Sequence, residues 1–298
     1  MRELKGVIPV LLTPFTNNGD VDVESLSKLV EHLNNKDIGG FWVLGTGSED
    51  MNLTFEQRLV VAQIVCGTNA GRVPIILGTS FFSMRETLDF MEATSHLEFD
   101  AYHFMPYHPL LSLDRIEWMY KKIADHSKKP LWMYTSANWA RFIPPSFIEK
   151  MKDYPNIAGV KFSTSNAAHT EKVISMADDK FQVITAVVRT FYANLCLGVK
   201  AATTVEACPF ADEIIRIYAD FQQGNMQESL EHQQKLNRML EDMPTSLADD
   251  NFFRVAEGKY ILSLRGLCLP LMSSYYRDVN PQEKDSIKNT LIKHNIAF

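Results

Sequence analysis

The feature that most constrains the fold is a regular alternation of short apolar runs with amphipathic segments. Eight runs are typical of buried strands, at residues 6–15, 40–46, 73–79, 100–106, 130–136, 157–164, 181–187 and 200–205. The segments between and after them have helical spacing or helix-capping residues, at 22–36, 54–70, 83–97, 113–127, 145–152, 168–177, 190–197 and 209–223. Strands that alternate with helices form a parallel sheet, and eight such pairs favour a closed (β/α)8 TIM barrel, an α/β fold, over an open sheet.

The C-terminal part of the chain breaks this alternation. Residues 227–298 contain three more helical stretches and no convincing strand. We therefore expect two parts: a (β/α)8 barrel over residues 1–226, and a C-terminal helical domain over residues 227–298 that packs on the barrel.

Composition and charge exclude several functional classes. Hydrophobic residues make up 46% of the 298 residues and charged residues 22%, as in ordinary globular proteins. The net charge of −6 argues against a nucleic-acid partner and against attraction to anionic membranes. No stretch approaches the roughly 18 apolar residues of a membrane span, and the apolar run at 7–12 is too short for a signal peptide. The four cysteines form no CxxC pair and have no histidine at zinc spacing, which predicts a reduced, cytoplasmic protein without a metal site.

Lys161 is the residue that points most clearly to chemistry. It lies in an apolar strand between Val160 and Phe162. If those two side chains pack against helices, alternation directs Lys161 into the barrel, where catalytic groups lie at the carboxyl ends of the strands. Burial there would lower the lysine pKa, and a neutral amine attacks a ketone to form a Schiff base. The alternative is a structural lysine that reaches solvent or pairs with a carboxylate.

Two further groups fall at neighbouring strand ends. Tyr134 lies on the strand before that of Lys161, so its phenol is placed to move a proton beside an imine. The alternative is an interior tyrosine with a satisfied hydroxyl. Thr46, Gly47 and Ser48 form a strand-to-helix turn, and the backbone N–H groups and hydroxyls of such a turn suit a carboxylate.

Five segments match, in order and at the right separations, the motifs of a known family: GVIPVLLTPF at 6–15, LGTGSE at 44–49, MPYHP at 105–109, LWMYT at 131–135 and GVKFSTSN at 159–166. On these residues the chain resembles the dihydrodipicolinate synthase / N-acetylneuraminate lyase family of class I, pyruvate-handling aldolases. The resemblance implies a (β/α)8 barrel with a C-terminal helical domain, usually a tetramer, without metal or organic cofactor. It also implies that Lys161 is the imine lysine, Tyr134 the catalytic phenol and Thr46 the first hydroxyl of the carboxylate-binding turn.

The chain departs from the family pattern in the turn and in the proton relay. The family usually has a second hydroxyl residue where this chain has Gly47, which keeps only a backbone N–H. Ser48, the next residue, is a candidate replacement. The synthases commonly carry a second tyrosine, which joins the relay across a subunit contact, where this chain has His108. A relay role and a surface role both remain open for His108.

A second set of departures concerns the other substrate. The synthases place an arginine five residues beyond the catalytic tyrosine, where it grips the second substrate's carboxylate. Here that position holds Trp139, and Arg141 lies two residues further on. Glu206 follows the last strand, where it can act as an acid–base group, bind hydroxyls or simply face solvent. The part that handles pyruvate is therefore kept, whereas the part that recognises a second substrate is rewritten.

These observations predict a Schiff-base-forming lyase or aldolase that acts on pyruvate or a longer 2-oxo acid, by aldol cleavage, addition or dehydration. The expected partner is a small 2-oxo acid, and the expected assembly is a homotetramer or homodimer. Two alternatives stay open: a non-catalytic barrel that binds a keto acid or sugar acid, and a true dihydrodipicolinate synthase. Incubation with a 2-oxo acid and borohydride separates the first alternative from a Schiff-base enzyme.

Overall fold

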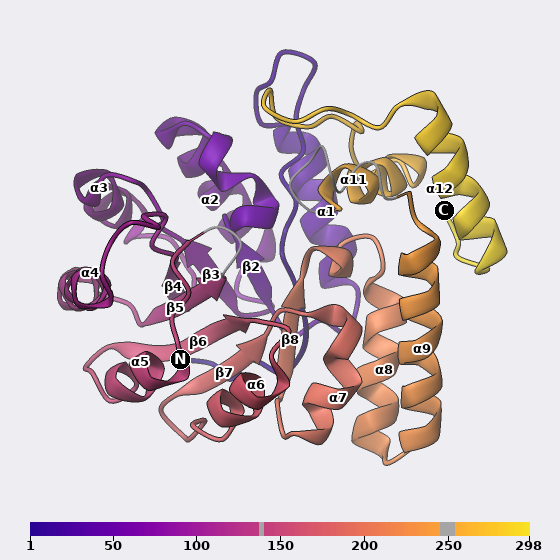
Figure 1. Ribbon diagram of the computed structural model, residues 1–298. Helices are drawn as coiled ribbons and strands as arrows, with labels where there is room; N and C mark the ends of the chain where they lie inside the picture. The colour runs from indigo at the N-terminus through magenta and orange to yellow at the C-terminus, as the bar shows by residue number, and fades with distance from the viewer. Residues whose placement is uncertain (137–139, 245–253) are drawn as a thin grey trace.

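The computed structural model describes residues 1–136, 140–244 and 254–298, and it has eight parallel strands in one sheet. The strands are β1 (Gly6–Pro9), β2 (Phe41–Val43), β3 (Ile75–Gly78), β4 (Ala101–Phe104), β5 (Leu131–Ser136), β6 (Ile157–Ser163), β7 (Gln182–Thr185) and β8 (Ala201–Thr204). Their order is β1-β8-β7-β6-β5-β4-β3-β2. A parallel bridge between Val10 and Trp42 joins the two ends, and the Leu11 N–H donates to the Trp42 carbonyl over 2.9 Å. The predicted (β/α)8 barrel is confirmed (Figure 1).

Helices alternate with the strands around the barrel. They are α1 (Val23–Asn34), α2 (Phe55–Asn69), α3 (Met84–Thr94), α4 (Leu113–His126), α5 (Pro145–Met151), α6 (Ala167–Ile174) and α7 (Phe191–Cys196). Several begin at a side chain that accepts from the first turn, as Thr54 does from the Gln57 N–H. Such caps satisfy backbone donors that have no partner within the helix, which fixes where each helix starts.

The strand expected over 40–46 is shorter in the structure, because β2 ends at Val43. Leu44 adopts a φ of 55°, which no extended strand allows, and Thr46–Ser48 forms a 3-10 turn. The chain therefore leaves the sheet early at this point. The Gly45–Ser48 segment therefore lies at the carboxyl end of the barrel as a turn and is not paired in the sheet.

The C-terminal helices are α8 (Ala211–Gln223), α9 (Met226–Asp242), α11 (Val255–Leu264) and α12 (Pro281–Lys293). Figure 1 shows α8 and α9 side by side on the flank of the barrel, joined at Gly224, whose φ of 83° suits the left-handed end of a helix. Helix α11 packs against the segments that follow β1 and β8, since a Cβ at Gly258 would lie 3.2 Å from Leu12 and 3.6 Å from Pro209. No helix in the described residues is long and apolar enough to span a membrane.

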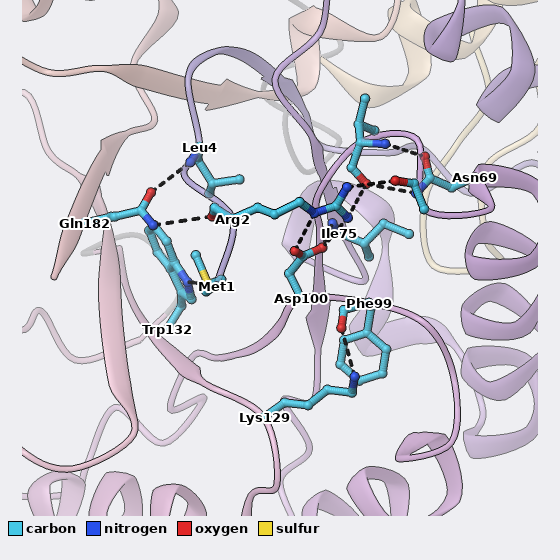
Figure 2. A network of polar contacts seen from close by, with 12 residues as sticks. Met1, Arg2, Leu4, Asn69, Ile75, Phe99, Asp100, Lys129, Trp132 and Gln182 are labelled. Carbon is cyan, nitrogen blue, oxygen red and sulfur yellow. Dashed lines mark hydrogen bonds and ion pairs between the residues drawn. The ribbon is translucent and has the colours of Figure 1, made fainter. Parts of the chain in front are cut away.

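The N-terminal segment is bonded to residues at the amino-terminal end of the barrel (Figure 2). The Arg2 guanidinium donates from Nε and Nη2 to the Asp100 carboxylate, both over 2.8 Å, and from Nη1 to the Gly71 carbonyl. The Leu4 N–H donates to the Gln182 side chain over 2.8 Å, which ties the same segment to β7. A two-point arginine–carboxylate pair fixes orientation as well as adding energy. This end is thus filled by structural contacts, and the carboxyl-terminal end is left for chemistry.

Candidate active site

Lys161 lies on β6 with its side chain in the barrel interior and only 4% of its surface exposed. It stands beside Tyr134 in the β5–β6 ladder. Its Nζ is 4.1 Å from the centre of the Tyr134 ring and 5.0 Å from that of the Trp42 ring. Burial lowers the pKa of Lys161 to about 7, although the negative charge of Asp50 opposes the shift. The amine is therefore substantially neutral near pH 7, the form that attacks a carbonyl.

The phenol of Tyr134 is connected to the turn after β2. Its hydroxyl lies 2.9 Å from Thr46 Oγ1, and both side chains are buried. Burial raises the pKa of Tyr134, so the phenol keeps its proton at neutral pH and can donate it. The structure thus brings together Lys161, Tyr134 and Thr46, which come from three different elements. An amine next to a protonated phenol suits the proton transfers of carbonyl chemistry.

The 3-10 turn Thr46–Ser48 is held internally rather than left open. The Ser48 N–H donates to the Gly45 carbonyl over 2.8 Å, and the Gly45 N–H donates to Ser48 Oγ over 3.3 Å. The Thr13 hydroxyl donates to the Ser48 carbonyl over 2.8 Å. The hydroxyl of Ser48 therefore serves its own turn, and the Thr46 hydroxyl is the one that meets the tyrosine.

The glycine at position 47 is explained by the loop after β8. A Cβ built on Gly47 would lie 2.1 Å from Val205 Cγ1 and 3.1 Å from Val10 Cγ1. Val205 occupies the space that a side chain at position 47 would need. The absence of a side chain at position 47 thus matches the presence of Val205, which fills that space.

We expect Gly47→Ala to destabilise the protein by about 1–3 kcal/mol, because the added methyl overlaps Val205 and must displace the turn. Urea unfolding measures the effect. The double variant Gly47→Ala/Val205→Ala should recover much of the loss, with Val205→Ala alone as control. A Gly47→Ala protein as stable as the parent would contradict this packing account.

In the described part of the chain, the residues predicted to bind a second substrate make no hydrogen bond or ion pair with Lys161, Tyr134 or Thr46. His108 is half-buried, and its Nε2 lies 2.8 Å from the Phe82 carbonyl. Arg141 is exposed, and Trp139 lies outside the described residues. Glu206 is half-buried and accepts a short hydrogen bond from the Thr204 hydroxyl at the end of β8.

Sequence reasoning missed a buried acidic group next to the turn. Asp50 is fully buried, and the Tyr107 hydroxyl donates to its carboxylate, 3.0 and 3.2 Å from the two oxygens. Arg58 Nη1 lies 4.0 Å from the same carboxylate. Burial raises the pKa of Asp50 to about 6. The sequence Glu49-Asp50 does not by itself indicate that either acidic side chain is buried. The burial becomes visible only from the partners that distant segments supply.

A buried ion pair fixes the C-terminal helices to the same turn. Glu49, in a left-handed conformation with φ of 61°, accepts a short bond from Lys259 of α11 and a 2.8 Å bond from the Ser273 N–H. Lys259 also donates to the Leu271 carbonyl over 2.9 Å. Helix α11 and the segment after it therefore restrain the residues next to Thr46. A buried pair with further hydrogen bonds specifies position more than it adds stability.

The interior histidine on β4 is not a metal ligand in this arrangement. His103 stacks on Trp42 with ring centres 4.2 Å apart, and its Nε2 lies 3.0 Å from the Val43 carbonyl. Burial and the charge of Lys161 lower the pKa of His103, so the ring is neutral and donates from Nε2. Within the described residues, no three histidine, cysteine or acidic side chains are placed to hold a metal ion.

Comparison with known proteins agrees with this architecture. The model of the "Dihydrodipicolinate synthetase family" matches residues 3–292. A 4-hydroxy-tetrahydrodipicolinate synthase from Sulfurihydrogenibium sp. is 24% identical over 298 residues and covers 98% of each chain. One from Thermodesulfovibrio yellowstonii is 27% identical, over 80% of this chain and 81% of its own.

Solved structures share the fold at low identity. The dihydrodipicolinate synthase of Bacteroides thetaiotaomicron superposes with a TM-score of 0.91 at 22% identity, over 98% of this chain and all of its own. The N-acetylneuraminate lyase of Proteus mirabilis gives 0.90 at 21% identity, over 99% of this chain and all of its own. Both names occur in the resemblance drawn from the sequence motifs, which the family match confirms.

Proposed function

This chain belongs to the dihydrodipicolinate synthetase family, and on that premise we propose that it is a Schiff-base-forming lyase acting on pyruvate or a longer 2-oxo acid. The observation that supports this most directly is the buried amine of Lys161, 4.1 Å from the centre of the Tyr134 ring. The Tyr134 hydroxyl is in turn bonded to Thr46. Because burial brings the pKa of Lys161 to about 7, the free amine is available at neutral pH.

The groups present suit each step of imine formation. Lys161 Nζ attacks the C2 carbonyl, forming the C–N bond while the carbonyl electrons move to oxygen. Tyr134 supplies a proton to that oxygen and receives one from the nitrogen, with Thr46 next to it in the relay. A further proton, taken from solvent through the same relay, lets the carbinolamine hydroxyl leave as water and gives the protonated imine. The imine then draws electrons from a bond at C3, whose other partner leaves without them, to give an enamine. Backbone N–H groups of the Thr46–Ser48 turn hold the substrate carboxylate, apart from the Ser48 N–H, which donates to the Gly45 carbonyl.

The fate of the enamine defines the reaction, and cleavage, addition and dehydration all pass through it. No metal or organic cofactor is needed, because the lysine imine is itself the electron sink. We propose that His108, Trp139, Arg141 and Glu206 belong to the region that selects the rest of the substrate. We also propose a homodimer or homotetramer in the cytoplasm, with a barrel over residues 1–226 and a helical domain over 227–298.

Trapping with borohydride tests the proposal. Incubation of the wild-type protein with pyruvate and borohydride should add a stable mass to the peptide that contains Lys161. No adduct, or an adduct on another lysine only, would favour a non-catalytic keto-acid-binding barrel. A screen of longer 2-oxo acids, with pyruvate release monitored, then identifies the substrate and the direction of the reaction.

We expect poor turnover with pyruvate and aspartate semialdehyde. The synthases' carboxylate-binding arginine position holds Trp139, and Arg141 is exposed. Loss of a charge-assisted pair costs about 1.5–3 kcal/mol, or roughly one to two decades in affinity. A coupled synthase assay measures this, with the pyruvate adduct as control for an intact site. Robust synthase turnover would show that another group binds that carboxylate.

A further inference from the structure

The barrel contains a buried hydroxyl that the proposed steps do not use. Thr203 lies on β8 and has no exposed surface. Its Oγ1 has no hydrogen-bond partner among the described residues. A buried hydroxyl without a partner is unfavourable, and in or near a site it indicates a ligand that supplies the missing bond. The position of Thr203 relative to Lys161 shows what that ligand can be.

Thr203 points into the barrel, as the pairing of its strand shows. Residues in register on parallel neighbours share a face of the sheet, and so do residues two apart on one strand. Thr203 is in register with Ile8 of β1, and Val10, two residues further, is bridged to Trp42. The Trp42 ring lies in the interior, with its centre 5.0 Å from Lys161 Nζ. Thr203 therefore shares the inner face with them.

The strand registers also fix the height of each inward side chain. In a barrel of this class the inward side chains of alternate strands form layers of four, and a layer advances by about two residues for each step of two strands. Trp42 is in register with Ala101 through Ile76, and His103 is two residues beyond Ala101. Trp42 and His103 stack with ring centres 4.2 Å apart, as members of one layer should.

The next step leads from His103 to Lys161. His103 is in register with Gly159 through Trp132, and Lys161 is two residues beyond Gly159. The distance of 5.0 Å from Lys161 Nζ to the centre of the Trp42 ring agrees with a shared layer. The advance of two residues thus holds for both steps that a measured contact can check.

One more step leads from Lys161 on β6 to Thr203 on β8. Lys161 is in register with Ile184 of β7. The residue after it, Thr185, is in register with Ala202, so Ile184 is in register with the residue before Ala202. Thr203 is two residues beyond that one. It is therefore the fourth member of the layer that contains the amine.

Two groups flank Lys161 on opposite sides. Tyr134 comes from β5, which precedes the strand of the lysine in the sheet, and it is bonded to Thr46. Thr203 comes from β8, on the other side. In the proposed mechanism the turn after β2 holds C1, and Tyr134 serves the oxygen on C2. The remaining arm of the trigonal C2, which is C3, is then directed to the side of Thr203.

The proposed carboxylate-binding turn lies just beyond Thr203 along the chain direction of β8. Val205 is two residues further, and a Cβ at Gly47 of the turn would lie 2.1 Å from Val205 Cγ1. A substrate that joins Lys161 to this turn therefore lies against the end of β8 that carries Thr203.

Two other atoms of the layer also have no partner among the described residues, but their rings are on the Tyr134 side. They are Trp42 Nε1 and His103 Nδ1, and the two ring centres lie 5.8 and 5.9 Å from that of Tyr134. The indole N–H only donates, and Nδ1 of the neutral imidazole only accepts. The hydroxyl of Thr203 can donate and accept, as bonding to an alcohol requires.

We propose that Thr203 is a specificity-determining residue that hydrogen-bonds a hydroxyl on C3 of the substrate, so that the preferred substrates are 3-hydroxy-2-oxo acids. The inference rests on the proposed function. Pyruvate carries only hydrogen on C3 and would leave the Thr203 hydroxyl unpaired. A site with a buried polar group discriminates against a ligand that leaves that group unpaired.

The first test compares two ligands of equal size on the wild-type protein. 3-Hydroxypyruvate and 2-oxobutyrate differ in carrying a hydroxyl or a methyl group on C3. Borohydride trapping over a range of concentrations measures half-saturation of the Lys161 adduct for each. Half-saturation should need about tenfold less 3-hydroxypyruvate, the effect of one hydrogen bond. Equal values, or a preference for 2-oxobutyrate, would overturn the proposal.

Thr203→Val separates this hydrogen bond from any difference in carbonyl reactivity, because it removes the hydroxyl and keeps the shape of the side chain. The preference for 3-hydroxypyruvate should fall about tenfold. Thr203→Ser keeps the hydroxyl and should retain the preference. Thr185→Val is the matched control, because Thr185 is also a buried hydroxyl without a partner among the described residues. It follows the inward Ile184 and so points out of the barrel, and its removal should leave both values unchanged.

The outcomes separate this inference from the proposed function. A Thr203→Val protein with the wild-type preference overturns the inference, even though all adducts form. If Thr203→Val does not fold, Thr203→Ala takes its place, and if neither folds the wild-type comparison decides. Absence of an adduct with pyruvate and with both longer acids in the wild type overturns the proposed function itself.

Discussion

Lys161→Ala is expected to lower turnover of the 2-oxo acid by about 10³-fold or more, because it removes the amine that is proposed to form the covalent imine. The trapped adduct should disappear with it. Far-ultraviolet circular dichroism and the urea midpoint should show a folded protein, since the substitution leaves the backbone pairing of β6 with β5 and β7 unchanged. Near-normal turnover in Lys161→Ala would remove the Schiff-base mechanism.

Lys161→Met is the matched control, because it keeps the unbranched chain and removes only the amine. The pKa of Lys161 falls from 10.5 to about 7 on folding, so between these values the unfolded chain binds more protons than the folded one. The free energy of unfolding of the wild type should therefore rise with pH from about 7 towards 10.5 relative to that of Lys161→Met. Parallel pH dependences in urea unfolding would contradict a buried amine.

Tyr134→Phe should lower turnover by about 10²–10⁴-fold, the usual effect of removing a positioned acid–base group. The ring beside Lys161 stays, so only the hydroxyl that meets Thr46 is lost. Substrate binding should change much less, because in the proposed mechanism the Thr46–Ser48 turn holds the carboxylate. The free energy of unfolding should fall by only about 1 kcal/mol, the value of one ordinary hydrogen bond.

Thr46→Val and the double variant complete this test. If Tyr134 and Thr46 form one relay, their effects on turnover should be much less than additive. Steady-state kinetics and urea unfolding on the four proteins measure both quantities. A badly destabilised Tyr134→Phe protein with near-normal turnover per folded molecule would make Tyr134 a packing residue and would favour the non-catalytic barrel.

The alternation of apolar runs with amphipathic helices was enough to predict the barrel. Each strand can be predicted from a local pattern of residues. Eight predicted strands with a helix between successive ones can be arranged in few topologies, because parallel neighbours need a crossover connection. The placement of Lys161 in an apolar strand is also local, so the sequence indicated both the residue and its direction. The family motifs at 6–15, 44–49 and 159–166 then tied these patterns to one family.

The surroundings of that lysine were decided by the tertiary structure alone. Gly47 was interpreted as a lost hydroxyl, but Val205, which follows β8, shows that the glycine is a packing requirement. Asp50 meets Tyr107 from 57 residues away, and Lys259 meets Glu49 from 210 residues away. Whether an acidic residue is solvated or buried depends on which distant segments cover it. A local sequence pattern does not show which distant segments bury a residue. That burial shifts the pKa values on which the chemistry depends.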